Sequence, residues 1–284
     1  MLSLVLPAPA KINLFLHVTG RRDDGYHLLE SVFVPISLAD TVQLTLRADG
    51  DIRLLNAPAG LSARNDLACR AARALQAATR TPLGVDIELV KCIPQGAGLG
   101  GGSSDAASTL LGLNRLWNLA LPRSELQNMG ETIGADVPFF VFGKPALARG
   151  VGERLQAVTL PVLQVVVASP GVAVATGPVF THPALTRNTP PLSTPVFNLN
   201  FGRNDLQPIA VGLAPEIERL STAFKAAGAQ PRMTGSGSCV FALAHRVGQA
   251  YRLRAALERA GWRAWVTRTL RQHPLYGLAD DVTI

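Results

Sequence analysis

The sequence predicts a mixed α/β protein of two domains, and three observations favour this fold class. Strand-like apolar runs and helical segments recur along both halves of the chain. The length of 284 residues falls between one large domain and two modest ones. A glycine-rich stretch at 143–152 leads into a new apolar run at 162–168. We therefore expect an N-terminal domain at 1–155 and a C-terminal domain at 156–284.

The first expected element is a strand at 11–18, where side chains alternate as they do on a pleated strand. The apolar set shares one face, which we assign to the core. Lys11 and Asn13 are then neighbours on the other face. This is either a lone polar pair on an edge strand or part of a functional site. A charged turn at 20–25 follows.

Three strand-like runs come next, at 31–36, 41–46 and 52–55. Behind them lies an alanine-rich segment that ends at Ala78 and has high helix propensity. Asn65 is of the residue type that caps helices, so we expect it to begin this helix.

A glycine-rich loop at 94–105 carries the strongest local signal. The apolar run 85–90 predicts a strand before it, and 106–116 predicts a helix after it. Residues 96–102 include five glycines, so few Cβ atoms hold a ligand away from the backbone. The free N–H groups and the positive dipole end of the helix favour an anion there. We interpret the loop as a phosphate site and not as a flexible linker. The candidate caps of the helix are Ser103, Ser104 and Asp105.

Other glycine-loop classes fit less well. Residues 96–101 match the dinucleotide fingerprint G-x-G-x-x-G, but this fingerprint requires an acidic residue at the end of a second strand. Glu125 has the right distance and the wrong context, because Pro122 or Ser124 starts a helix there. A P-loop would require lysine where Gly102 stands, and the H-R-D and D-F-G signatures of protein kinases are absent from the sequence.

Asp136 stands in a tight glycine-proline segment flanked by apolar residues, at 133–140. We expect it to be partly buried. A carboxylate in this setting either caps backbone N–H groups or takes part in chemistry.

The second half of the chain is expected to contain a long proline- and threonine-rich loop and a second glycine-serine loop. Apolar runs predict strands, and apolar periodicity predicts helices between them. In chain order, we expect a strand at 162–168, the long loop at 182–195, helices at 206–211 and 215–226, the glycine-serine loop at 233–239, a strand at 240–244 and an amphipathic helix at 251–257.

The net charge of +7 allows a nucleic-acid partner, with several arginines near the C-terminus. An ordinary amphipathic helix with a solvated basic face explains these arginines better. A modest positive field also suits small polyanionic substrates. We therefore expect small-molecule partners and no nucleic acid.

The sequence also indicates the compartment. Every apolar run is interrupted before about 18 residues, so we expect no membrane span. The first twenty residues lack the features of a secretory signal. Cys69, Cys92 and Cys239 are far apart and odd in number, which argues against a disulfide framework or a zinc site. We expect a cytoplasmic protein.

Three separated segments resemble the three motifs of the GHMP kinases, in the same order and spacing. They are Pro7 to Asn13 with Gly25-Tyr26-His27, Pro94 to Ala107, and Met233 to Phe241. The resemblance covers essentially the full length. Within the family it is closest to the kinases that act on 4-diphosphocytidyl-2-C-methyl-D-erythritol in the non-mevalonate isoprenoid pathway.

The resemblance implies a two-domain GHMP-kinase fold with the active site in the interdomain cleft. It implies ATP as co-substrate, Mg²⁺, and transfer of the γ-phosphate to the 2-hydroxyl of the methylerythritol moiety. Lys11 and Asp136 match the catalytic pair. Tyr26 and Phe180 would sandwich the cytosine, and His27 would hydrogen-bond its edge. The implied substrate-binding residues are Asn13, Tyr26, His27, Thr176, Phe180, Gly235 and Ser236. The implied ATP-binding residues are Asn65, Lys91, Pro94, Gln95, Gly96, Ala97, Gly98, Leu99, Gly100, Gly101, Gly102, Ser103 and Ser104.

The metal ligands stay open. Many GHMP kinases hold Mg²⁺ with a loop serine and a separate glutamate, and this glutamate is not evident in the sequence. Either Ser103 or Ser104 ligates the ion, or the phosphates hold it nearly alone. A homodimer is also left open.

Three other functions compete with this interpretation. A kinase of the same family acting on homoserine or mevalonate would have no base to stack on Tyr26 and Phe180. A non-catalytic nucleotide-binding regulator would have no need of both Lys11 and Asp136. An oxidoreductase would use the G-x-G-x-x-G match described above.

Overall fold

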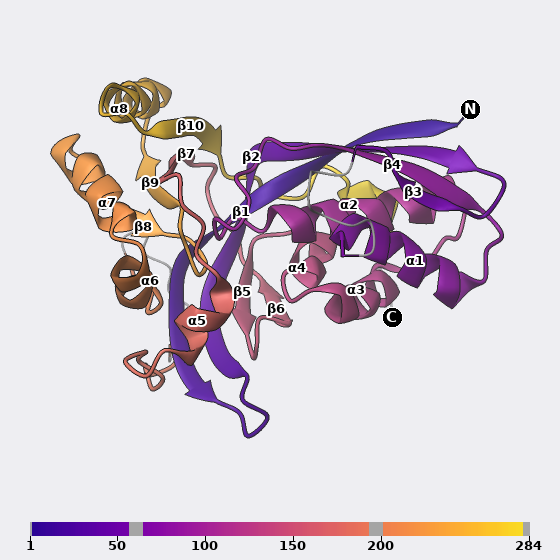
Figure 1. Cartoon of the computed structure of the whole chain (residues 1–284), viewed down its shortest axis with the longest axis horizontal. Helices are drawn as coiled ribbons and strands as arrows, with labels where there is room; N and C mark the ends of the chain where they lie inside the picture. Colours follow the sequence, from indigo (N-terminus) through magenta and orange to yellow (C-terminus); the bar gives the residue numbers. More distant parts are fainter. Residues whose placement is uncertain (1, 57–64, 193–200, 281–284) are drawn as a thin grey trace.

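The computed structural model describes residues 2–56, 65–192 and 201–280, and within them the strands form two sheets (Figure 1). The first has the order β3-β4-β2-β5-β6, with β1 also paired to β2, and the second has the order β10-β7-β9-β8. The first sheet comprises β1 (Ser3–Arg21), β2 (His27–Arg47), β3 (Ile52–Leu54), β4 (Gly84–Val90), β5 (Ala146–Arg149) and β6 (Arg154–Ala157). The second comprises β7 (Gln164–Ser169), β8 (Arg232–Met233), β9 (Val240–Ala244) and β10 (Arg263–Arg268).

Strands β1 and β2 form one long antiparallel hairpin that contributes to all three hydrophobic core clusters. The expected runs 31–36 and 41–46 are parts of the single strand β2. Three irregularities in the β1–β2 register let the long hairpin bend. Leu6 packs in the first core, whereas Leu16 packs in the second. The hairpin therefore connects the two halves of the molecule directly.

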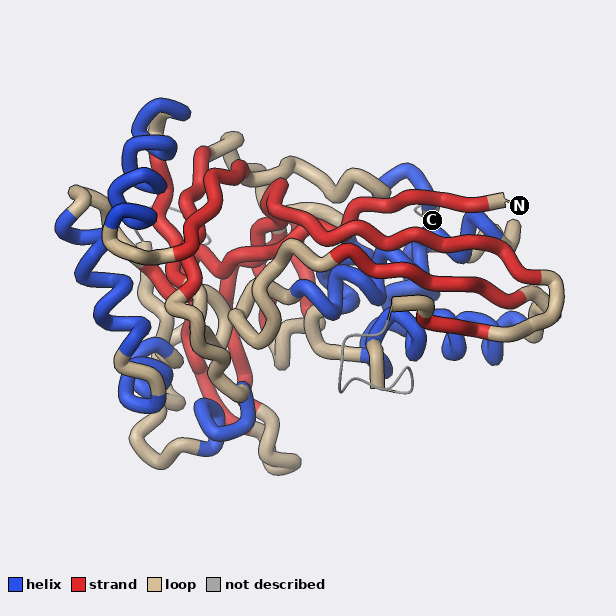
Figure 2. Tube along the Cα trace, turned by 45° about the horizontal axis from the view of Figure 1, so that its top comes forward, coloured by secondary structure: helices blue, strands red, loops and turns tan. Residues whose placement is uncertain are grey.

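Helices α1 (Leu67–Thr79), α2 (Gly101–Leu116), α3 (Arg123–Ile133) and α4 (Val137–Phe142) cover one face of the first sheet (Figure 2). Two expected helix starts are wrong. The cap of α1 is Asp66, whose Oδ1 accepts the Cys69 N–H at 3.0 Å, and not Asn65. Helix α2 begins directly after Gly100, which has φ 72° and lacks a side chain that could cap. Ser103, Ser104 and Asp105 therefore lie inside the helix.

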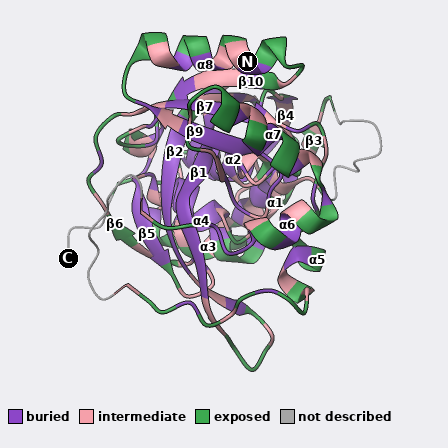
Figure 3. Ribbon diagram, turned by 90° about the vertical axis from the view of Figure 1, so that its left-hand side faces the viewer, coloured by how far each residue is buried: buried purple, intermediate pink, exposed green. Residues whose placement is uncertain are grey.

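Helices α7 (Glu216–Ala226) and α8 (Val247–Arg259) pack against the second sheet, and α6 (Gln207–Leu213) packs against α7 (Figure 3). The short α5 (Thr176–Thr181) contacts the long hairpin through the rings of Phe180 and His27. Helix α8 has the expected amphipathic pattern, since Leu253 and Leu257 are buried and Arg252 is exposed. The 3₁₀ turn η1 (Tyr276–Leu278) returns to the first core, where Leu275 packs. The division of domains near residue 155 remains a prediction.

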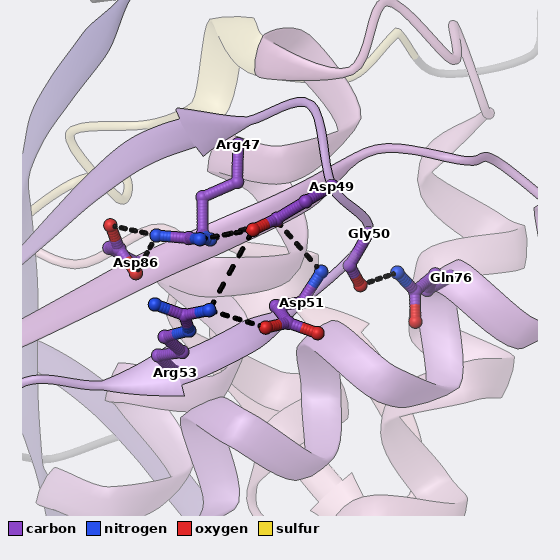
Figure 4. Close-up of polar contacts among 7 residues, drawn as sticks. All are labelled: Arg47, Asp49, Gly50, Asp51, Arg53, Gln76 and Asp86. Carbon is purple, nitrogen blue, oxygen red and sulfur yellow. Dashed lines mark hydrogen bonds and ion pairs between the residues drawn. The ribbon is translucent and has the colours of Figure 1, made fainter.

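A network of polar contacts connects the first sheet to α1 near the turn between β2 and β3 (Figure 4). Arg47 on β2 binds Asp86 on β4 at 3.0 Å and also Asp49 in the turn before β3. The guanidinium of Arg47 lowers the pKa of Asp49 to about 2. Gln76 of α1 donates to the backbone oxygen of Gly50 at 2.7 Å. The network ties β2, β4, the turn and α1 into one unit.

None of the helices within the described ranges has the length and apolar character needed to cross a membrane. Cys69, Cys92 and Cys239 are free, as the sequence indicated.

Candidate active site

A cleft of about 970 Å³ is lined by residues of the first sheet and by loop and helix residues from both halves of the chain. It is lined by all the residues expected to take part in catalysis or binding except Ser104. The lining residues from that set are Lys11, Asn13, Tyr26, His27, Asn65, Lys91, residues 94–103, Asp136, Thr176, Phe180, Gly235 and Ser236.

The glycine loop enters the cleft at the start of α2. The first intrahelical bond runs from the Ser104 N–H to the Gly100 oxygen at 2.9 Å. The N–H groups of Gly101, Gly102 and Ser103 therefore have no partner within the helix. Gly102 is exposed toward the cleft, and a Cβ there would meet only Leu67 Cδ1, at 3.5 Å. This helix start offers an anion three N–H donors and a positive dipole end.

Other glycines of the loop serve packing as well. A Cβ on Gly98 would lie 2.1 Å from the Thr234 backbone oxygen, because the second glycine-serine loop packs directly on the first. The Cys239 N–H donates to the Ala97 oxygen at 3.1 Å, and the Lys11 N–H donates to the Leu99 oxygen at 2.9 Å. Both halves of the molecule thus hold the glycine loop.

Lys11, Asn13 and Asp136 meet at one point of the cleft. The Lys11 ammonium lies 3.5 Å from the Asp136 carboxylate and donates to Asn13 Oδ1 at 2.8 Å. Lys11 and Asn13 are buried and have partners in Asp136 and Gly235, so they are not a lone polar pair, although β1 pairs in its sheet only with β2. Asp136 precedes α4, yet its side chain forms no capping hydrogen bond there. Its side chain is 31% exposed, as expected for a partly buried carboxylate open to a ligand.

Asn13 also connects the second glycine loop to β1 and β2. Its Oδ1 accepts the Gly235 N–H at 2.9 Å, and its Nδ2 donates to Ser31 Oγ at 2.8 Å. Its own backbone N–H donates to Thr234 Oγ1 at 3.1 Å. Asn13 therefore holds Lys11 and the second loop in register, and its expected contact with substrate stays a prediction.

Lys91 lies beside the glycine loop in a buried charge cluster. Its ammonium contacts the carboxylates of Asp40 and Asp105. Burial raises the pKa of Asp105 to about 7, although Lys91 acts in the opposite direction. Asp40 also accepts the Ile93 N–H at 2.8 Å. Lys91 thus anchors α2 to the strand that precedes the loop. This role of Asp40 and Asp105 was not predicted, because neither residue stands in a sequence pattern with Lys91.

The far end of the cleft contains the expected base-binding residues. The rings of His27 and Phe180 are 5.2 Å apart with an interplanar angle of 40°. Tyr26 is 65% exposed, at the mouth of the cleft. Thr176 Oγ1 and Ser236 Oγ are 2.9 Å apart and join α5 to the second glycine loop. Sequence reasoning missed Arg187, which contacts His27 from within the long loop.

Two protein-family models match the chain: GHMP kinases N terminal domain at residues 66–144 and GHMP kinases C terminal at residues 192–264. The chain belongs to the GHMP kinase family.

Two relatives of this GHMP kinase are similar over nearly the whole length. The 4-diphosphocytidyl-2-C-methyl-D-erythritol kinase of Azoarcus sp. (strain BH72) is 50% identical over 274 residues, covering 96% of each chain. The protein of the same name from Thiobacillus denitrificans (strain ATCC 25259 / T1) is 52% identical over 280 residues, covering 99% of this chain and 100% of the relative.

Solved structures agree in fold. A 4-(cytidine 5'-diphospho)-2C-methyl-D-erythritol kinase superimposes with a TM-score of 0.81 at 40% identity, covering 94% of this chain and 99% of the other. A mevalonate kinase superimposes with a TM-score of 0.66 at 16% identity, covering 95% of this chain and 99% of the other. The second comparison shows the shared fold alone.

The donors for a metal ion are few in this GHMP kinase. Within residues 2–56, 65–192 and 201–280, no group of three or more His, Cys, Asp or Glu side chains could hold a metal. Ser103 lines the cleft, whereas the Ser104 hydroxyl is buried and has no hydrogen-bond partner in the described part of the chain. Of the two candidate serines, only Ser103 therefore faces the ligand space.

Proposed function

We infer that this protein transfers the γ-phosphate of ATP to the 2-hydroxyl of 4-diphosphocytidyl-2-C-methyl-D-erythritol, in the non-mevalonate isoprenoid pathway. The observation that carries this inference is the Lys11–Asp136 pair in a cleft that also contains the glycine loop and the His27–Phe180 ring pair. One end suits the phosphates of ATP, and the other suits a pyrimidine base. Homoserine and mevalonate lack such a base.

The acceptor hydroxyl is a tertiary alcohol and therefore a poor nucleophile. Phosphoryl transfer needs positioning, charge neutralisation and a group that takes the hydroxyl proton. Asp136 accepts this proton as the acceptor oxygen bonds to the γ-phosphorus and the bond from that phosphorus to the leaving oxygen of ADP breaks. Lys11, 3.5 Å from the carboxylate, neutralises charge on the transferred group. The three N–H groups at the start of α2 that lack a partner within the helix bind the remaining phosphate oxygens.

Mg²⁺ fits this site as an ion carried by the nucleotide. Mg²⁺ keeps several waters and uses one or two protein ligands together with phosphates, so a cleft with few donors suits it. The Ser103 hydroxyl is the residue that would bind it. When bound, Mg²⁺ neutralises charge on the β- and γ-phosphates. A cytoplasmic location and a homodimer remain predictions.

A substrate panel tests the proposed function. We expect ADP release, coupled to a spectrophotometric readout, with 4-diphosphocytidyl-2-C-methyl-D-erythritol and at most trace release with homoserine or mevalonate. A thermal-shift series with ATP, NAD and cytidine diphosphate provides a second criterion, because a ligand that binds only the folded state raises the melting temperature. Stabilisation by NAD and not by ATP would contradict the proposal.

A further inference from the structure

The guanidinium of Arg187 connects the two rings at the far end of the cleft. Its Nε donates to His27 Nε2 at 3.0 Å. Its Nη2 donates to the backbone oxygens of Phe180 and His182 at 3.0 and 2.8 Å, and its Nη1 donates to the Leu185 oxygen at 3.1 Å. One side chain thus holds the end of α5 and the imidazole of His27 in a fixed relation.

The contact also determines which nitrogen of His27 carries the proton. An arginine is always protonated and has no acceptor, so Nε2 must accept the hydrogen bond. In the neutral ring the proton then resides on Nδ1. Two cations face this imidazole, Arg187 from the long loop and Arg21 from β1, and together with burial, which is the larger effect, they lower the pKa of His27. His27 is therefore neutral at pH 7 with an Nδ1–H donor. The described residues offer this Nδ1 no hydrogen-bond partner.

We propose that Arg187 is a positioning residue that fixes the Nδ1–H tautomer of His27 and so makes the cleft select cytosine over uracil. The inference rests on the proposed function, which places a cytosine against these rings. At N3, cytosine has an acceptor and uracil has an N–H donor. A fixed donor on His27 pairs with the first and opposes the second, because an unpaired buried donor costs more free energy than a hydrogen bond gains.

The test compares Arg187→Met, which keeps bulk and removes the donors, with Arg252→Met on the exposed face of α8 as the matched control. Calorimetry measures the dissociation constants of cytidine diphosphate, uridine diphosphate and ADP at pH 8 and pH 6. At pH 8 we expect Arg187→Met to weaken cytidine diphosphate binding about tenfold or more, with ADP binding unchanged. Discrimination against uridine diphosphate should fall.

The pH series separates this role from a merely structural one. Without Arg187, one of the smaller causes that lower the pKa of His27 is removed, so this pKa rises, although burial and Arg21 still lower it. As the pH falls, a larger fraction of the His27 rings in Arg187→Met than in the unaltered protein becomes imidazolium, which carries the Nδ1–H again. Cytidine diphosphate binding by Arg187→Met should therefore recover toward pH 6, relative to the unaltered protein and the Arg252→Met control in the same buffers.

Two further measurements address the same point. Nitrogen-15 spectra of the imidazoles should show Nδ1 protonation of His27 in the unaltered protein and a mixture of tautomers in Arg187→Met, with His27→Ala used for assignment. In a His27→Ala background, Arg187→Met should no longer change the discrimination between cytidine diphosphate and uridine diphosphate, since Arg187 acts on this discrimination through His27.

Several results would overturn the inference. They are unchanged cytidine diphosphate affinity in Arg187→Met, equal losses for both pyrimidine nucleotides without recovery at pH 6, or an unaltered tautomer. Failure of the proposed function has a different signature, because the unaltered protein itself would then fail to prefer cytidine diphosphate at either pH.

Discussion

At the scale of single residues, a substitution at Asp136 distinguishes a catalytic role from a structural one. Its carboxylate caps no backbone N–H at α4 and lies 3.5 Å from the Lys11 ammonium. Asp136→Asn keeps the shape and removes the proton acceptor, so we expect kcat to fall by roughly 10² or more. Single-turnover kinetics with the cytidine substrate measures this, and calorimetry should show nearly unchanged ATP affinity.

Lys11→Ala provides the partner measurement for Asp136→Asn. We expect kcat to fall in Lys11→Ala as well. If the pair acts as one unit, the activation free energy of the double variant should rise by no more than the sum of the rises in the two single variants. Turnover near normal in a folded Asp136→Asn variant would leave this residue without a catalytic role.

His273 makes the stability of the fold depend on pH. It is buried near η1, its Nδ1 accepts the Leu275 N–H at 3.1 Å, and its Nε2 has no hydrogen-bond partner within the described ranges. Burial, aided by Arg123, lowers the pKa of His273 to about 3. The folded state thus keeps the ring neutral while the unfolded chain takes up a proton below about pH 6.5. This group therefore costs stability progressively as pH falls from about 6.5 toward 3, by at most about 1.4 kcal/mol per pH unit.

His273→Asn retains an acceptor for Leu275 and cannot titrate. Urea unfolding between pH 7 and pH 4 should show a shallower loss of the free energy of unfolding in His273→Asn than in the unaltered protein. Parallel curves for the two proteins would mean that His273 does not set the acid sensitivity.

At the scale of elements, the start of α2 can be tested without disturbing its packing. Gly100 is a poor choice, because it has φ +72° and an added Cβ would lie 3.0 Å from the Phe140 ring. Gly102 has open space toward the cleft. We expect Gly102→Val to raise the ATP dissociation constant at least about tenfold, because the valine occupies the volume of the phosphate oxygens. Calorimetry measures it.

The control for this element is Gly212→Val in α6, where an added Cβ meets nothing within 4 Å. It should bind ATP normally and melt close to the unaltered protein. If Gly102→Val is folded and binds ATP as tightly as Gly212→Val, the phosphates lie elsewhere.

Helix and strand boundaries show why the elements were only partly predictable. Asn65 and Asp66 are both good capping residues, and only the conformation of the chain decides that Asp66 accepts the Cys69 N–H. Ser37 and Asp40 lie between the two expected runs and resemble a break in the sequence. The backbone stays extended there because β1 pairs with Ala39 and Asp40 and because the Leu38 N–H donates to Thr267 Oγ1.

At the scale of the whole molecule, the substrate is expected to bridge the two halves. Tyr26 lies at the end of the long hairpin, and Phe180 belongs to α5 beyond the first sheet. Binding energy from the base would orient the hydroxyl near Asp136. We expect Phe180→Ala to lower kcat/KM for the cytidine substrate, with a loss of transition-state stabilisation of about 1–3 kcal/mol, as measured by steady-state kinetics. ATP affinity should be preserved.

Free methylerythritol phosphate serves as the control substrate, since it lacks the base. It should react very slowly and should be almost indifferent to Phe180→Ala. Equal sensitivity of the two substrates would exclude stacking of the base on this ring.

The sequence by itself determined the features that depend on neighbouring residues: the strand, glycine loop and helix around 94–105, the amphipathic α8, and the motifs that identified the family. The tertiary structure alone decided which distant groups meet. Asn13 binds Gly235, 222 residues away, and Arg187 binds His27, 160 residues away. The reason is physical: periodicity and capping reflect local backbone geometry, whereas a side chain's partner depends on how separate segments pack, which no local pattern encodes.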